Sequence, residues 1–221
     1  MPERDAVRVG RLILVPAIIT LAVTLGRLAG ELMGASDAWF SRAPGGKAAL
    51  FGIVWLIPLF GIYFGLRLDR AGEGPSSVGK AAGLALAAFA VNVALLAVAF
   101  ATVKNPLAQN GILALTSWIA LLVPRRGWPA LWRVLLAYAL AARIPVLIVM
   151  FLSIFGAWDT HYAKARPDFP PMGPWSVFFW AALLPQLSIW IFLTIAGGTL
   201  FGTLAAAVRR MGGRSPSSSL P

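Results

Sequence analysis

The chain has 221 residues, of which 59% are hydrophobic and only 12% are charged, whereas a soluble domain usually carries about a quarter charged residues. This composition excludes an ordinary soluble protein and predicts one that is embedded in a lipid bilayer. The net charge of +11 comes from basic residues spread along the chain, so no nucleic-acid-binding domain is expected, and the absence of cysteine excludes disulfides and thiolate-bound metals.

Six apolar stretches follow one another along the chain, and each is long enough to cross roughly 30 Å of hydrocarbon at about 1.5 Å per residue. The fourth is the weakest, because it is short and contains Asn110, Thr116 and Ser117. The sequence therefore predicts an all-α integral membrane protein, a bundle of six transmembrane helices. The predicted spans cover residues 11–34, 48–67, 80–103, 108–124, 130–157 and 175–206.

The six spans form a single predicted transmembrane domain, residues 11–208, between two cytoplasmic tails. The N-terminal tail covers residues 1–10. The first span follows a charged amino end, as a secretory signal does, but it is longer and no A-x-A cleavage site follows it, so we expect it to be retained. The C-terminal tail, residues 209–221, is rich in Gly, Ser and Pro, which predicts disorder.

The distribution of Lys and Arg supports six spans. Of the 19 basic residues, 12 lie on one side and 5 on the other when the spans alternate in direction, and only Arg27 and Arg143 fall well within spans. Removing the fourth span would mix the two sets. By the positive-inside rule the richer side is cytoplasmic, which places both termini in the cytoplasm and favours a bacterial-type inner (plasma) membrane as the location.

Glycines recur at four-residue spacing in three of the predicted spans. Such spacing lets helix backbones approach closely in lipid. We expect it to serve packing within the chain and, secondarily, a homo-oligomer formed through the glycines of the first or the last span. Membrane lipids are the other expected partner. The spaced glycines are Gly26, Gly30 and Gly34, Gly61 and Gly65, and Gly198 and Gly202.

A layer of polar residues is predicted near the middle of the bilayer. Arg143 lies about 13 residues into the fifth span, and Asn92, Gln186, Thr116 and Ser117 lie at a similar depth in theirs. A charge at this depth costs several kcal/mol, so it normally faces a bundle interior or a water-filled cavity. We expect Arg143 to find neutral partners among these four residues.

Carboxylates are scarce in the predicted spans. Glu31 is the only acid within one, and Arg27 lies four residues earlier on the same helix face, so these two are expected to form an interfacial pair near the outer surface. In the outer loop, Asp159 and His161 form an Asp-x-His pair that could hold a metal, but two ligands do not define a site. His161 is the sole histidine, and no metal or cofactor is predicted.

The sequence leaves three functions open. The first is a small transporter or channel-like protein for an anionic or amphiphilic solute, with Arg143 as the binding cation and Asn92 and Gln186 as orienting groups. The second is a non-transporting structural or assembly subunit, in which Arg143 is fully bonded in a closed core. The third is a lipid-modifying enzyme using His161 and Asp159, and catalysis is disfavoured because no Ser/His/Asp set lies within a span. The solute, the oligomeric state and an inverted repeat of spans 1–3 and 4–6 are not determined by the sequence.

Overall fold

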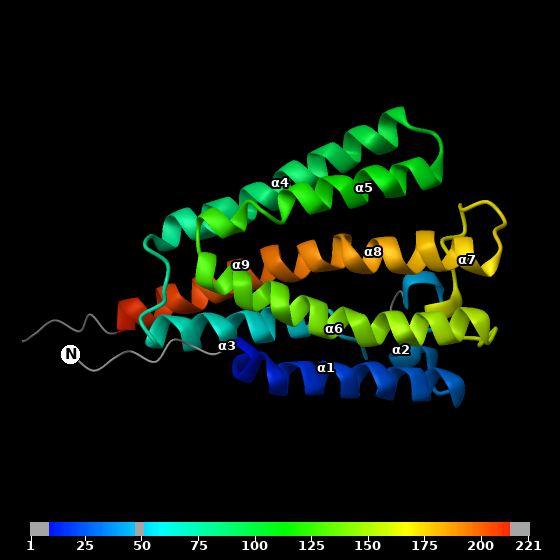
Figure 1. Ribbon diagram of the computed structural model, residues 1–221, viewed down its shortest axis with the longest axis horizontal. Helices are drawn as coiled ribbons and strands as arrows, with labels where there is room; N and C mark the ends of the chain where they lie inside the picture. Colours follow the sequence, from blue (N-terminus) through cyan, green and yellow to red (C-terminus); the bar gives the residue numbers. More distant parts are fainter. Residues whose placement is uncertain (1–8, 47–50, 213–221) are drawn as a thin grey trace, which may run out of the picture.

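The computed structural model describes residues 9–46 and 51–212, and this part of the chain contains helices and no strands. Figure 1 shows the long helices running back and forth along one axis, so that α1 begins and α9 ends at the same end of the molecule. The long helices are α1 (Val9–Leu32), α3 (Leu56–Arg70), α4 (Val78–Thr102), α5 (Pro106–Ala120), α6 (Pro129–Phe155) and α9 (Ile189–Gly212).

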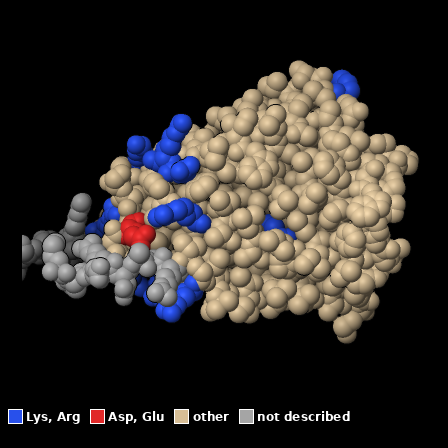
Figure 2. Space-filling view, viewed as in Figure 1, with Lys and Arg blue, Asp and Glu red and all other residues tan. Residues whose placement is uncertain are grey.

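Five segments of the described chain are long and apolar enough to cross a membrane, and they support a polytopic α-helical membrane protein. On the face drawn in Figure 2, Lys and Arg gather at one end of the molecule while the broad middle is almost entirely free of charge. A broad surface without charge is what the hydrocarbon core of a bilayer would contact. The five segments are Val9–Leu32, Val78–Thr102, Pro106–Arg126, Pro129–Phe155 and Pro174–Gly212.

The second predicted span, residues 48–67, differs in the structure. Helix α3 begins at Leu56 and has 15 residues, which is about 22 Å and less than a bilayer core. Pro58 lies in its first turn, where the missing N–H of proline leaves no helical bond unmade. The apolar run before Leu56 forms turns, and residues 47–50 lie outside the described residues.

Helix α3 packs against α9 through the predicted glycines. A Cβ atom at Gly61 would lie 2.7 Å from the Cα of Gly198, and one at Gly65 would lie 2.6 Å from the Cα of Gly202. Glycine at positions 61 and 65 of α3 is what allows this approach, because a side chain there would meet the backbone of α9. The glycines of α9 are therefore covered by α3 and α6 of the same chain, and the homo-oligomer stays a prediction.

The glycines of α1 also contact the chain itself. Gly26 faces the ring of Phe51, and Gly30 faces the ring of Phe40 in the short helix α2 (Asp37–Phe40). Gly34 has a φ of +68°, which glycine adopts without strain, and it follows the end of α1. These glycines therefore make room for aromatic rings of the segment after α1 and, at Gly34, allow the turn that follows the helix.

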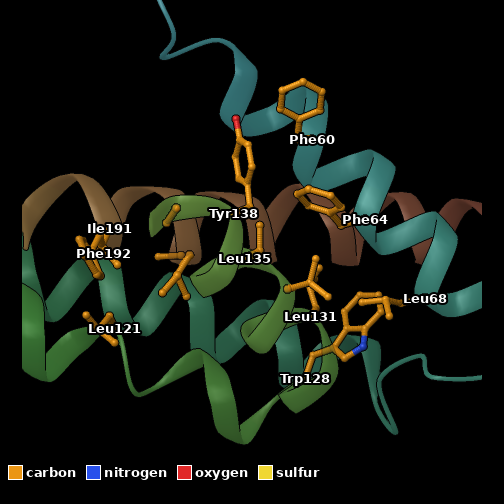
Figure 3. Packing of buried hydrophobic residues seen from close by; sticks show 14 of the residues in the cluster. Phe60, Phe64, Leu68, Leu121, Trp128, Leu131, Leu135, Tyr138, Ile191 and Phe192 are labelled. Carbon is orange, nitrogen blue, oxygen red and sulfur yellow. The ribbon is translucent and has the colours of Figure 1, made fainter. Parts of the chain in front are cut away.

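The main apolar core draws buried side chains from α1, α3, α4, α5, α6 and α9. Figure 3 shows Tyr138 of α6 extending toward Phe60 and Phe64 of α3, and its ring meets each of theirs edge-on, with centroids 5.3 and 5.4 Å apart. The Tyr138 hydroxyl also hydrogen-bonds with Thr20 Oγ1 of α1 at 2.8 Å. One tyrosine therefore joins three helices.

An ion-pair cluster closes the end of the bundle where α9 finishes. Asp69 of α3 is only 1% exposed at its side chain and accepts from Arg209 and Arg210 of α9, with Arg210 Nη2 2.7 Å from Oδ1. These hydrogen bonds outweigh the opposing effect of burial and lower the pKa of Asp69. Helix α9 reaches Gly212, so the first residues of the predicted C-terminal tail are helical, while 1–8 and 213–221 lie outside the described residues.

Candidate functional site

A cavity of about 350 Å³ lies between α1, α5, α6 and the Pro174–Gly212 segment. Its volume falls within the roughly 300–1,000 Å³ of ordinary small-molecule sites. The cavity runs from residues in the middle of α6 to the loops at the end of the bundle away from the chain termini. Its deep end is formed by Arg143, Gln186 and Trp190, its walls include Val23, Ile53, Leu113, Val146 and Met150, and its loop end includes His161, Lys164, Arg166 and Phe169.

Arg143 is buried at the deep end with few protein partners. It is 3% exposed, and its Nη1 donates to Gln186 Oε1 at the long distance of 3.4 Å. Its guanidinium carbon lies 4.9 Å from the ring centroid of Trp190, a cation–π contact. The Nε of Arg143 is buried and has no partner in the described structure. Because a guanidinium carries five N–H donors, most of its hydrogen-bonding capacity is unused by the described residues.

Gln186 also has donor capacity to spare. Its Nε2 donates to the sulfur of Met150 at 3.6 Å, and a thioether is a weak acceptor. The deep end of the cavity therefore combines one cation and one amide whose donors are poorly matched by acceptors. Such an imbalance favours an oxygen-rich anion.

A broken helix positions Gln186. Between α7 (Pro174–Val177) and α8 (Leu184–Leu187) the chain forms a single π-helical stretch, η4 (Phe178–Leu183), and Ser188 then leaves helical geometry at φ −122° and ψ −77°. In the π register the N–H of Leu184 donates to the Phe179 carbonyl. Pro185 has no N–H for the next carbonyl, that of Trp180.

Asn110 of α5 compensates for this loss. Its Nδ2 donates to the Trp180 carbonyl at 2.9 Å, and Asn110 itself lines the cavity. A freed carbonyl in lipid must find a donor, so the side chain replaces the missing backbone bond. Asn110 is not among the predicted site residues, although its polarity within an apolar stretch is a signal that could identify it.

The predicted polar layer divides into two groups. Arg143 and Gln186 meet at the cavity. Asn92 of α4 instead donates to Ser117 Oγ at 3.2 Å and to Thr116 Oγ1 at 3.5 Å of α5, and these three are not among the lining residues. The five residues are predicted to lie at a similar depth, but the direction in which each helix turns its side chains separates them into these two groups.

The Arg27–Glu31 pair is buried and extends to a third residue. Arg27 Nε lies 2.8 Å from Glu31 Oε1, and Glu31 is only 1% exposed. Glu31 also accepts the backbone N–H of His161 at 2.8 Å and contacts its Nδ1 at 2.5 Å. The other donors of Arg27 bind the carbonyls of Ser41, Gly46 and Phe51. Arg27 and His161 both line the cavity.

The loop after α6 does not pair Asp159 with His161. Asp159 is exposed and binds Arg42 and Lys164, with distances of 3.1 and 2.8 Å. Burial lowers the pKa of His161, although its contact with Glu31 acts in the opposite direction. In the described residues no three His, Cys, Asp or Glu side chains lie close enough to hold a metal.

The charged side chains that line the cavity are all basic in the described structure. Four of its described lining residues are Arg or Lys and none is Asp or Glu. No protein-family model, curated protein or solved structure matches the chain.

Proposed function

We propose that this protein is a small transporter or channel-like protein that takes an anionic or amphiphilic solute into its mid-membrane cavity. The observation that carries this proposal is Arg143, a buried cation with an unpartnered Nε at the deep end of a cavity of about 350 Å³. Leaving a charge buried without a counter-charge is costly, and an entering anion would remove that cost. Gln186 would orient the bound group.

The proposed topology has six crossings with both termini in the cytoplasm of a bacterial-type plasma membrane. Helix α3 would be the short second crossing, supported along its length by α9. The clustering of basic side chains at the end where α1 begins supports this orientation by the positive-inside rule. Reporter fusions after Pro124 and after Asp159 should report opposite sides, and like signals from both would overturn this topology.

A structural or assembly subunit is the second candidate, and the same observation weighs against it. A purely structural role favours a closed core in which the buried arginine is fully hydrogen-bonded. Arg143 has a single hydrogen bond within the described part of the chain, at 3.4 Å. Its position beside a cavity favours solute binding.

The experiment measures thermal unfolding of the protein in an uncharged detergent with a panel of organic and inorganic anions at constant ionic strength. A ligand at 100 times its Kd stabilises the folded state by about 2.7 kcal/mol. We expect at least one anion to stabilise the parent, and Arg143→Gln to abolish that shift. Arg126→Gln, which removes an exposed arginine at the far end, is the matched control and should keep it.

Transport is then tested by uptake of the stabilising anion into proteoliposomes. Uptake by the parent and by Arg126→Gln, but not by Arg143→Gln, is the expected result. If no anion shifts unfolding, or if Arg143→Gln retains the shift, Arg143 is not a solute-binding cation and the proposal is wrong.

A further inference from the structure

The charge balance of the cavity limits the charge of its ligand. Three of the four lining cations already have carboxylate partners, because Arg27 binds Glu31, Lys164 shares Asp159 with Arg42, and Arg166 binds Asp168. Arg143 is the lining cation without one in the described structure. A monoanion would neutralise it. A dianion would bring one uncompensated negative charge into an apolar interior, which is strongly unfavourable.

The shape of the donor group indicates the kind of monoanion. The guanidinium is planar, and its pairs with carboxylates are frequently bidentate, with two parallel N–H···O bonds. In Arg143 the Nε is unpartnered, while Nη1 is held by Gln186 and the face of the group lies against Trp190. A planar carboxylate that meets the Nε edge would satisfy this free donor, and because the Nε is enclosed by protein in this structure, the Arg143 side chain must turn toward the cavity to bind it.

The walls and the volume indicate the rest of the ligand. Between the deep end and the loops the cavity is bounded by aliphatic side chains, including Val23, Leu113 and Val146. With about 30 Å³ for a water-sized group, a cavity of about 350 Å³ holds on the order of a dozen non-hydrogen atoms. This is too small for a two-chain phospholipid. The head group would also lie at mid-membrane depth, where a lipid resting in a leaflet does not place it.

From these features we infer that the cavity takes a monocarboxylic acid with an apolar body of about a dozen non-hydrogen atoms, bound with its carboxylate on Arg143 and Gln186. The inference rests on the proposed function and names the class of its solute. The carboxylate enters first, and the apolar body fills the space between α1, α5 and α6 toward Phe169. The paired cations Lys164 and Arg166 at the loop end attract the anion from water without competing for it at depth.

The test compares the binding of four probes to the protein at pH 8, in nanodiscs of a zwitterionic phospholipid and by calorimetry. Decanoate has both the head and the body, acetate has only the head, and 1-decanol has only the body. Octyl phosphate has a comparable body and a dianionic head at this pH, since its second pKa is about 6. We expect decanoate to bind best, with each of the other three at least about tenfold weaker.

Variants separate the site from partition into lipid. Arg143→Gln should weaken decanoate binding by about tenfold to a hundredfold, because a charge-assisted pair is lost. Arg143→Lys should bind decanoate with an affinity between those of the parent and Arg143→Gln, because lysine keeps the charge but not the planar edge. If Arg143→Gln does not fold, Leu113→Trp fills the cavity wall with Arg143 intact and should weaken decanoate similarly. Leu115→Trp, on the exposed face of the same helix, is its control and should bind as the parent does.

The outcomes distinguish this inference from the function on which it rests. If octyl phosphate binds in an Arg143-dependent way and decanoate does not, the carboxylate assignment is wrong while anion binding stands. If 1-decanol binds as well as decanoate, the cavity does not recognise the head group and the assignment is wrong. If none of the anions binds in an Arg143-dependent way, both the inference and the proposed function fail.

Discussion

The contact between α3 and α9 leads to a specific expectation for Gly61→Ala. The added Cβ would lie 2.7 Å from both the Cα and the carbonyl oxygen of Gly198. Backbone atoms cannot rotate out of the way as a side chain can, so the two helices must separate. Separation would also loosen the adjacent Phe60 and Phe64, which pack against Tyr138.

The magnitude follows from two opposing effects. Overpacking a well-packed contact costs typically about 1–3 kcal/mol, whereas alanine in a helix interior is favoured over glycine by up to about 1 kcal/mol. Gly83→Ala in α4 isolates the second effect, because nothing lies within 4 Å of a Cβ at that position. Gly198→Ala should be intermediate, since its Cβ would meet a terminal methyl of Leu135, which can move.

The assay is thermal unfolding in detergent, followed by the fluorescence of the nine tryptophans. For chains of this length, 1 kcal/mol corresponds to a change of about 2–4 °C in Tm. We expect Tm to fall for Gly61→Ala, to fall less for Gly198→Ala, and to stay equal or rise for Gly83→Ala. A Gly61→Ala protein as stable as Gly83→Ala would refute the close helix approach, and with it the placement of α3 along α9.

Three further results are expected. Asp69→Asn should lose about 1–2 kcal/mol at pH 7, a value kept low because its arginine partners are partly exposed. Since the pKa of Asp69 is lowered in the folded state, its stabilisation is complete above the ordinary aspartate pKa and is lost as the pH falls through the lowered one. The difference in stability between parent and variant should therefore be full at pH 6 and smaller at pH 3, and a difference that is the same at both pH values contradicts the pair. The single histidine can be followed by NMR without assignment, and burial should hold the pKa of His161 below 6.5, so a value at or above 6.5 argues against its buried position. Asn110→Leu should lower the free energy of unfolding by about 1–3 kcal/mol, because it leaves the Trp180 carbonyl unbonded. The control, Asn105→Leu at the exposed start of α5, should lose no more than a helix cap, roughly 0.5–2 kcal/mol. Hydrogen exchange across η4 that is unchanged in Asn110→Leu would contradict the bond to Trp180.

Much of the helical architecture could be predicted from apolar length alone. The third predicted span, 80–103, corresponds to Val78–Thr102, and the fifth, 130–157, corresponds to Pro129–Phe155. The start of α3 could not be predicted in this way, because the composition is equally apolar on both sides of Leu56. What distinguishes the two sides is Pro58 in the first helical turn and contacts to distant residues.

The candidate site was predictable only in part, for a geometric reason. Position within a span gives the depth of Arg143 and Gln186, but the rotation of each helix about its axis decides which side chains meet. Rotation depends on packing, here on contacts such as Gly61 with Gly198. The contact of Glu31 with His161 joins residues 130 positions apart, and no spacing rule in a single sequence connects them.

Arg27 stabilises the non-helical backbone between α1 and α3 by donating hydrogen bonds to its carbonyls. Non-helical backbone at membrane depth is tolerated only where its polar groups are satisfied by protein or by trapped water. The guanidinium of Arg27 reaches the carbonyls of Ser41, Gly46 and Phe51. One side chain thus takes the place of water, because it donates hydrogen bonds to three backbone carbonyls that lipid could not bond.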